Sequence, residues 1–210
     1  MQDWLRDKQI IIKSGDGVYL KDINGKKYID GVSSLWANIH GHSKNEIDYA
    51  VIRQLKKIAH STLLGLGSEP SILLAKELVK IAPRNLKKVF YSDSGATAVE
   101  IALKIAFGYW YHKGKKNKTR FIALKEAYHG DTVGSVSVGG MDLFHKIFKP
   151  LLFKTYFAPA PYCYRCKLRK NKNICIMDCI LKLEDIVKKH KNELAGLIIE
   201  PMIQGAAGMI

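Results

Sequence analysis

The sequence predicts an α/β protein with a mostly parallel β-sheet, and three observations support this fold class. Apolar runs of strand length occur at 87–93 (KKVFYSD), 120–125 (RFIALK) and 195–200 (AGLIIE). Segments with helical periodicity lie between them, and strands that alternate with helices form parallel sheets covered on both faces. The composition, 47% hydrophobic and 25% charged over 210 residues, is that of a globular protein.

The first third of the chain is predicted to form a β-hairpin followed by two helices. Asn24-Gly25 tolerates the positive φ angles of a tight turn and lies between the runs 17–20 and 26–29. The segment 43–46 (SKNE) is typical of a capping box. One face of the helix that would follow it is marked by Ile47, Ala50, Val51 and Leu55. A second helix is expected over 71–81, ended by Pro83.

A β-α-β unit is predicted next. The strand 87–93 leads into a long helix, and the strand 120–125 follows that helix. One apolar face of the helix consists of Ala98, Ile101, Ala102, Ile105 and Tyr109. A later helix around 183–190 precedes the third strand. Because open parallel sheets bind ligands at the carboxyl ends of their strands, we expect functional residues at 92–96, 125–131 and 200–208.

Charge and hydropathy exclude several functional classes. Lys and Arg number 34 against 19 Asp and Glu, a net charge of +15, so a polyanionic partner has to be considered. The densest basic stretches, 112–120 and 167–172, contain no interleaved aromatic residues and no recognition-helix pattern, so no nucleic-acid partner is expected. No stretch approaches the ~18 apolar residues of a membrane span or the apolar run of a signal peptide. We expect a cytoplasmic protein with no membrane partner.

Polar motifs follow each of the three predicted strands. At 93–96 (DSGA) the start of the long helix offers free N–H groups to an anion such as phosphate, although on this segment alone Asp93 or Ser94 is more simply explained as an N-cap. At 128–131 (YHGD) an aromatic face suited to a planar cofactor stands beside an imidazole and a carboxylate, and the alternative is an ordinary turn. Glu200 precedes a glycine-bordered loop, and the alternative there is a solvated carboxylate.

Taken together, these segments resemble the class III pyridoxal-phosphate (PLP) aminotransferases, and within them the adenosylmethionine-8-amino-7-oxononanoate aminotransferases of biotin synthesis. The resemblance runs over essentially the whole chain, through NGKKYIDGVSSLWANIHGH, STLLGL, YSDSGATAVEIALKIAFGYW, AYHGDTVGSVSVGG and LAGLIIEPMIQGAAGM. The strings YHGDT, SSLW and QGAAGM favour the biotin branch. Another class III aminotransferase, of the ornithine or 4-aminobutyrate type, is the alternative, but such enzymes usually have a Glu where this chain has Ala206.

The resemblance implies a fold-type I architecture that is incomplete in this chain. Residues 1–42 would be the N-terminal hairpin segment of the small domain and a substrate loop. Residues 43–210 would be a partial PLP-binding large domain, its sheet lacking later strands, with a Cys-rich loop at 160–180.

Site residues are implied by the same resemblance, residue by residue. The cofactor phosphate would lie on the backbone of Gly95 and Ala96, with Ser94 beside them. Over the pyridine ring and beside the substrate we expect Tyr128. The remaining implied residues are Asp131, supporting Tyr128 or lining the substrate pocket, Glu200, near the phenolic edge of the ring, and Trp36, in the substrate pocket.

The implied reaction transfers an amino group from S-adenosylmethionine, or from lysine in some relatives, to 8-amino-7-oxononanoate, giving 7,8-diaminononanoate. No lysine of this chain matches the motif that forms the Schiff base with the cofactor, so no catalytic residue is nominated. We therefore expect the 210 residues alone to be inactive. They would be part of a homodimeric enzyme, one half of a split enzyme completed by a partner chain, or a non-catalytic remnant.

The four cysteines form one local cluster. Cys163, Cys166, Cys175 and Cys179 follow the pattern C-x2-C-x8-C-x3-C, which is compatible with a structural tetrahedral zinc site but is not a standard finger spacing. The alternative is four reduced thiols on an exposed loop. In either case a role in bracing the loop is expected rather than catalysis.

Overall fold

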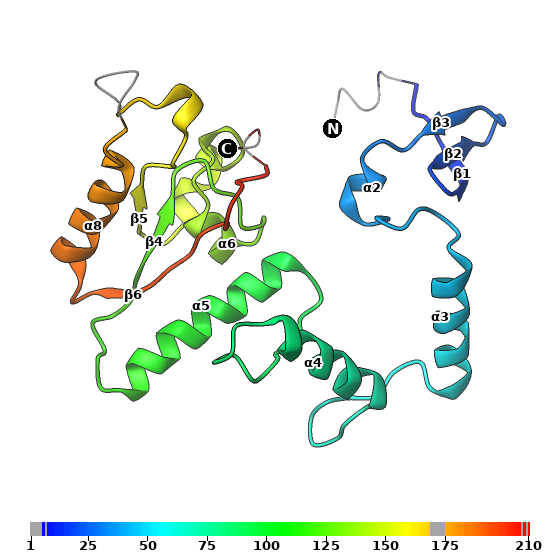
Figure 1. Cartoon of the computed structure of the whole chain (residues 1–210), viewed down its shortest axis with the longest axis horizontal. Helices are drawn as coiled ribbons and strands as arrows, with labels where there is room; N and C mark the ends of the chain where they lie inside the picture. Colours follow the sequence, from blue (N-terminus) through cyan, green and yellow to red (C-terminus); the bar gives the residue numbers. More distant parts are fainter. Residues whose placement is uncertain (1–5, 7, 169–174, 207, 209) are drawn as a thin grey trace. The chain divides into compact units, whose positions relative to one another are not determined.

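The computed structural model describes residue 6 and residues 8–168, 175–206, 208 and 210. The chain divides into two units, Met1–Val89 and Phe90–Ile210, and each is described by itself (Figure 1). The first unit holds an antiparallel sheet and the second a parallel sheet with helices, so the α/β fold class is confirmed. The domain boundary predicted after residue 42 falls inside the first unit and stays a prediction.

Three short strands, β1 (Ile12–Asp16), β2 (Tyr19–Asp22) and β3 (Lys27–Ile29), form the sheet of the first unit. They pair antiparallel in chain order, so the predicted hairpin is confirmed as β2 and β3, while β1 was not predicted. Gly25 has φ +86° in the turn between β2 and β3. The turn is closed by Asp22, whose carboxylate accepts the backbone N–H groups of Asn24 and Lys26, each at 2.9 Å.

Helices follow this sheet: the short turn α2 (Ser33–Trp36), α3 (Asn45–Lys57) and α4 (Glu69–Ile81). Both predicted helices are confirmed. The predicted capping box is wrong, because α3 has Lys44 at its N-cap and no side chain caps it. The Ser43 hydroxyl instead donates to the carbonyl oxygen of Gly15 at 2.8 Å, so a contact with the sheet has replaced the local cap.

In the second unit, strands and helices alternate. The elements are α5 (Gly95–His112), β4 (Arg120–Leu124), α6 (Val133–Val138), α7 (Asp142–His145), the 3-10 turn η1 (Lys146–Leu151), β5 (Thr155–Ala158), the 3-10 turn η2 (Cys163–Arg165), α8 (Asp178–His190) and β6 (Leu194–Leu197). The strand order is β5-β4-β6, and both pairings are parallel. The predicted strands at 120–125 and 195–200 are thus confirmed, the second with a shorter extent.

The predicted strand at 87–93 is wrong. Residues 87–93 adopt no strand, and Phe90 is 68% exposed. Its apolar run satisfied the sequence pattern, but a strand also needs a partner whose N–H and C=O groups it can bond. Among the described residues no strand pairs with this segment, and the sheet of the second unit consists of β5, β4 and β6. The sequence TYFA of β5 gave too short an apolar signal to be recognised.

Because β4 is buried on both faces, it is the centre of the second unit's core. Ile122 and Leu124 pack with Leu194 and with Leu183 of α8. Phe121 and Ala123, which point to the other face, pack with Leu103 of α5. Apolar residues on both faces are the signature of a central parallel strand.

Where the chain leaves β4 it passes directly against the start of α5. Gly130 has φ +120°, and a Cβ atom placed there would lie 2.6 Å from the Cβ and 2.8 Å from the Cα of Ala96. The Ser135 hydroxyl donates to the Ala96 carbonyl oxygen at 3.1 Å on the same approach. Only glycine meets both demands, the positive φ and the close packing.

We expect Gly130→Ala to lower the free energy of unfolding by roughly 2–4 kcal/mol, since it combines a strained φ with overpacking. The matched control is Gly108→Ala inside α5, where the new methyl group meets nothing within 4 Å. That change should raise the free energy of unfolding by about 0.5–1 kcal/mol. Urea unfolding followed by circular dichroism measures both. Equal midpoints for Gly130→Ala and wild type would refute the close-packing account.

Candidate functional site

The N-terminus of α5 presents donors for an anion. A capping box closes it: the Ser94 hydroxyl accepts the Thr97 N–H at 3.2 Å, and the Thr97 hydroxyl oxygen accepts the Ser94 N–H at 3.0 Å. The N-cap interpretation of Ser94 is confirmed. The N–H groups of Gly95 and Ala96 lie in the first turn, where the helix supplies no acceptor. No atom lies within 4 Å of a Cβ placed on Gly95, so the space beside this turn is open.

The Tyr128 ring is held at its hydroxyl and on one face. Its hydroxyl donates to Asp131 Oδ2 at 2.6 Å. This hydrogen bond, helped by partial burial and by the charge of Asp131, raises the pKa of Tyr128 to about 12. The phenol therefore keeps its proton at neutral pH. The imidazole of His145, only 4% exposed, stacks against the Tyr128 ring with centroids 6.3 Å apart and an interplanar angle of 21°.

Glu200 joins the loops that follow two neighbouring strands. Its Oε1 accepts the Tyr128 N–H at 2.9 Å, and its Oε2 accepts the Gly205 N–H at 2.9 Å. The alternative of a merely solvated carboxylate is therefore wrong. Burial lowers the pKa of His129, although the charge of Glu200 acts in the opposite direction. His129 is accordingly neutral at physiological pH.

Two polar residues of the site, one buried and one partly buried, were missed at the level of sequence. Gln204 is 2% exposed and donates its side-chain N–H to the Lys125 carbonyl oxygen at 3.1 Å. Glu100 of α5 accepts the Thr132 hydroxyl at 2.6 Å and the Gly134 N–H at 2.7 Å. The sequence offered only weak signals for these two residues. Gln204 is a lone amide in a loop of small and apolar residues, and Glu100 is a lone carboxylate in an apolar helical turn.

The three segments predicted to carry functional residues, 92–96, 125–131 and 200–208, thus meet beside the sheet of the second unit, although the first follows no strand. The turn at 128–131 touches the start of α5 through Gly130 and Ala96, and it is tied to the loop after β6 through Glu200. The structure thus brings these segments together, and ligand binding by them stays a prediction. The individual ligand contacts of Ser94, Gly95 and the other nominated residues stay predictions.

Beside His145 lies a cavity of about 740 Å³. It is lined by His145 and by lysines, of which Lys149 is paired with Asp142 at 2.9 Å. None of the residues nominated for the cofactor or the substrate lines it. The candidate site is therefore the strand-end cluster rather than this cavity.

In the first unit, Trp36 stands on a strained turn. All four residues of α2 have positive φ, from +48° to +71°, so the turn is left-handed. The left-handed conformation costs roughly 1–2 kcal/mol for each L-residue. The Trp36 side chain that this turn presents is 65% exposed. Because the two units are described separately, its relation to Tyr128 stays a prediction.

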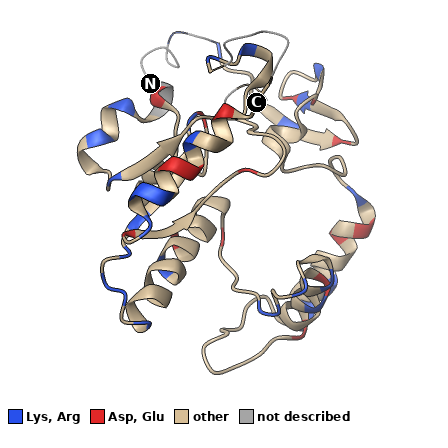
Figure 2. Ribbon diagram, turned by 60° about the vertical axis from the view of Figure 1, so that its left-hand side comes forward, with Lys and Arg blue, Asp and Glu red and all other residues tan. Residues whose placement is uncertain are grey.

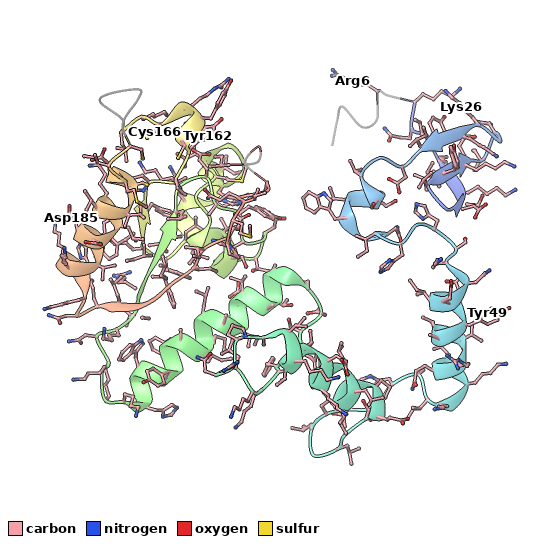
Figure 3. The ribbon with its side chains drawn as sticks, viewed as in Figure 1. Arg6, Lys26, Tyr49, Tyr162, Cys166 and Asp185 are labelled. Carbon is pink, nitrogen blue, oxygen red and sulfur yellow. The ribbon has the colours of Figure 1, made fainter. Side chains whose placement is uncertain are left out.

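The four cysteines line one small pocket of about 20 Å³ at the start of α8, together with Tyr162 and Asp178. Figure 3 shows Cys166 and Tyr162 in this part of the second unit. None of the cysteines is in a disulfide. Within the described ranges, no group of three or more His, Cys, Asp or Glu residues is arranged to hold a metal ion, so the zinc site stays a prediction. Residues 169–174 of the predicted Cys-rich loop, and with them most of the basic stretch 167–172, lie outside the described residues.

The distribution of charge and the character of the helices concern two classes of partner, nucleic acids and membranes. Figure 2 shows Lys and Arg spread over both units rather than gathered on one element. None of the described helices has the length and apolar character needed to cross a membrane.

Comparisons with known proteins connect this site to a family. The sequence profile of the class-III aminotransferases matches residues 2–210. A Geobacter sulfurreducens protein named adenosylmethionine-8-amino-7-oxononanoate aminotransferase is 52% identical over 211 residues, which cover 100% of this chain and 47% of that protein.

Solved structures agree with this relationship. The crystal structure of the Methanocaldococcus jannaschii protein of the same name has 51% identity and a TM-score of 0.90, with 100% of this chain and 45% of that chain covered. A PLP-bound amine transaminase from an uncultivated Pseudomonas species has 35% identity and a TM-score of 0.89, covering 98% of this chain and 47% of that one. The chain spans about half the length of these relatives. With nearly every residue matched by the family profile, the chain belongs to the class-III family of PLP-dependent aminotransferases.

Proposed function

We propose that these 210 residues form the N-terminal and central part of an aminotransferase of biotin biosynthesis. The reaction is the transfer of an amino group from S-adenosylmethionine, with lysine as the alternative donor, to 8-amino-7-oxononanoate. What supports it is the 52% identity, over the whole chain, to relatives named for this activity. The structural observation that carries it is the meeting of the segments 93–96, 128–131 and 200–205 beside the sheet of the second unit.

The residues of these segments fit PLP. The cofactor's phosphate is a dianion, and the first-turn N–H groups of Gly95 and Ala96 stand at the positive end of the α5 dipole. Open space lies beside Gly95, where the phosphate would sit, and the turn that carries Tyr128 packs against Ala96 through Gly130. PLP, when bound, supplies an electron sink for amino-group transfer.

Each polar residue of the site has a distinct task in this proposal. Tyr128 remains a phenol, and its hydroxyl proton is held at Asp131 Oδ2, so the ring is fixed in orientation and is not a base at neutral pH. Both oxygens of Glu200 are engaged by backbone N–H groups. Glu200 therefore positions the Tyr128 backbone and the loop after β6, and its charge is available to a cationic group nearby.

We also propose that the complete enzyme is a cytoplasmic homodimer. Ile105 and Tyr109 of α5 are 58% and 55% exposed, so an apolar strip of this helix is available to be covered by further protein. Four thiols without a disulfide are consistent with a reducing compartment. Light scattering of the complete enzyme at twice the chain mass supports the dimer, and a single chain mass refutes it.

The test of function is a fusion of these residues to the C-terminal half of the Methanocaldococcus relative, with that intact relative as the control. We expect the fusion to bind PLP and to form 7,8-diaminononanoate from 8-amino-7-oxononanoate. Mass spectrometry of the reaction mixture detects this product. The 210 residues alone should show no transfer, because they contain no lysine that matches the cofactor-binding motif.

Three results of that test contradict the proposal in different ways. Transfer to the acceptors of ornithine or 4-aminobutyrate enzymes, but not to 8-amino-7-oxononanoate, assigns the chain to another class III activity. A folded fusion that binds PLP without any transfer indicates a non-catalytic remnant. Activity of the 210 residues alone shows that a lysine of this chain does supply the missing group.

For the cysteines we propose structural zinc, supported by their spacing and by the single pocket that all four line. Zinc binding requires deprotonated thiols, and Cys179 lies in the first turn of α8. We expect about one zinc per chain after purification without chelator, and none in the Cys163→Ser, Cys166→Ser double variant. A metal-free wild-type protein under reducing conditions leaves four free thiols and removes the zinc hypothesis.

A further inference from the structure

The left-handed turn α2 requires an external constraint. Ser33, Ser34, Leu35 and Trp36 have φ of +50°, +48°, +61° and +71°, and none of them is glycine. L-residues enter this region singly and rarely in succession, because the Cβ atom crowds the following carbonyl oxygen. A run of four such residues persists only where the surroundings over-determine it.

Asp30 supplies that constraint. Its carboxylate accepts three hydrogen bonds of 2.8 Å each, from the Ser34 N–H, from the Ser34 hydroxyl and from His42 Nε2. The side chain of Asp30 is 6% exposed. These bonds, the two from Ser34 first, lower the pKa of Asp30 to about 2, so the carboxylate is ionised at physiological pH. An ionised carboxylate only accepts, which places the shared hydrogen on His42 Nε2.

The antiparallel sheet fixes both members of this pair. Asp30 directly follows β3, and its N–H donates to the Val18 carbonyl oxygen at 2.9 Å. His42 exchanges backbone hydrogen bonds of 2.8 and 3.1 Å with Gly17. A Cβ on Gly15 would lie 2.6 Å from the Cγ of His42, so the imidazole packs directly against the backbone of β1. Asp30 is thus fixed by the antiparallel sheet while its carboxylate bonds to the turn.

We propose that Asp30 is a positioning residue that, braced by His42, holds Ser33–Trp36 in the left-handed turn and so presents the Trp36 indole to the apolar chain of the keto-acid amino acceptor. The Trp36 N–H donates to the Val32 carbonyl oxygen at 2.8 Å, so reversal of the turn would redirect this side chain. The part of the proposal that concerns the acceptor rests on the proposed function. The part that concerns the turn stands on the first unit alone.

The test is Asp30→Asn in the fusion enzyme described above. A carboxamide keeps one acceptor oxygen and replaces the other with an NH2 donor. Either the Ser34 N–H at Oδ1, or the Ser34 hydroxyl and His42 at Oδ2, therefore loses its acceptor, and the charge of the carboxylate is lost in both cases. We expect KM for 8-amino-7-oxononanoate to rise roughly tenfold, with kcat and KM for the amino donor within twofold of wild type. Asp16→Asn, on the exposed surface of β1, is the matched control and should change none of these values.

A second-site substitution separates strain from misfolding. Glycine adopts positive φ without the Cβ penalty, so adding Leu35→Gly, at a side chain that is 71% exposed, should return KM of the Asp30→Asn enzyme to within threefold of wild type. The turn is observed independently by 19F NMR of protein labelled with 5-fluorotryptophan, the Trp36 resonance being identified by Trp36→Phe. We expect this resonance to shift in Asp30→Asn and to return in the double variant.

The 19F resonance and the KM for the acceptor test separate parts of the proposal. An unshifted Trp36 resonance in Asp30→Asn overturns the positioning role, whatever the enzyme does. A shifted resonance with unchanged KM for the acceptor overturns the role of Trp36 in acceptor binding. If the wild-type fusion has no activity with this acceptor, the proposed function and the acceptor part of the inference fail together, and the 19F shift still decides whether Asp30 holds the turn.

Discussion

The carboxylate of Glu200 is the interaction on which the candidate site depends. β4 and β6 are neighbouring parallel strands, so the loops that leave them start side by side. Backbone bonds to the neighbouring strands continue to Lys125 and Ile198, and farther along the two loops Glu200 joins them. One oxygen of Glu200 accepts the Tyr128 N–H and the other accepts the Gly205 N–H. The turn that begins at Tyr128 also packs Gly130 against Ala96, so Glu200 joins the loop after β6 to a turn that itself contacts the start of α5.

The same chemistry recurs in the first unit. Asp30 holds the Ser34 N–H and hydroxyl, just as Glu200 holds two backbone N–H groups, and Asp131 holds the Tyr128 hydroxyl. In each case a carboxylate fixes local geometry by accepting hydrogen bonds and is not left free as an acid or a base. This division is what a cofactor-dependent enzyme requires, since the cofactor carries the reaction and the protein supplies binding and orientation.

Sequence patterns predicted the parts of the fold that depend on local periodicity. The helices α5 and α8 and the strand β4 were predicted because their apolar residues repeat at the right spacing, and the strand ends then indicated where the site lies. The prediction of a strand at 87–93 failed because strand formation depends on a partner, and no described strand pairs with this segment. The capping box at 43–46 failed because Ser43 bonds to Gly15, a residue far away in the sequence.

Contacts at long range account for what the sequence could not predict within the site. Gln204 and Glu100 are recognisable as site residues only through their partners on other segments, Lys125 and Thr132. The left-handed turn at Ser33–Trp36 contains no glycine from which it could be predicted. It depends on Asp30, which follows β3 and accepts the Ser34 N–H.

The most direct measurement of the account is amide hydrogen exchange in Glu200→Gln. A carboxamide has one acceptor oxygen, so it can hold the N–H of Tyr128 or of Gly205 but not both. We predict that exchange speeds up by roughly tenfold or more in peptides spanning 126–132 or 203–206, while β4 itself keeps its protection. Glu184→Gln, which breaks only the exposed pair with Lys188 on α8, is the control and should leave both peptides unchanged. Unaltered protection of both loops in Glu200→Gln would contradict the claim that this carboxylate assembles the site.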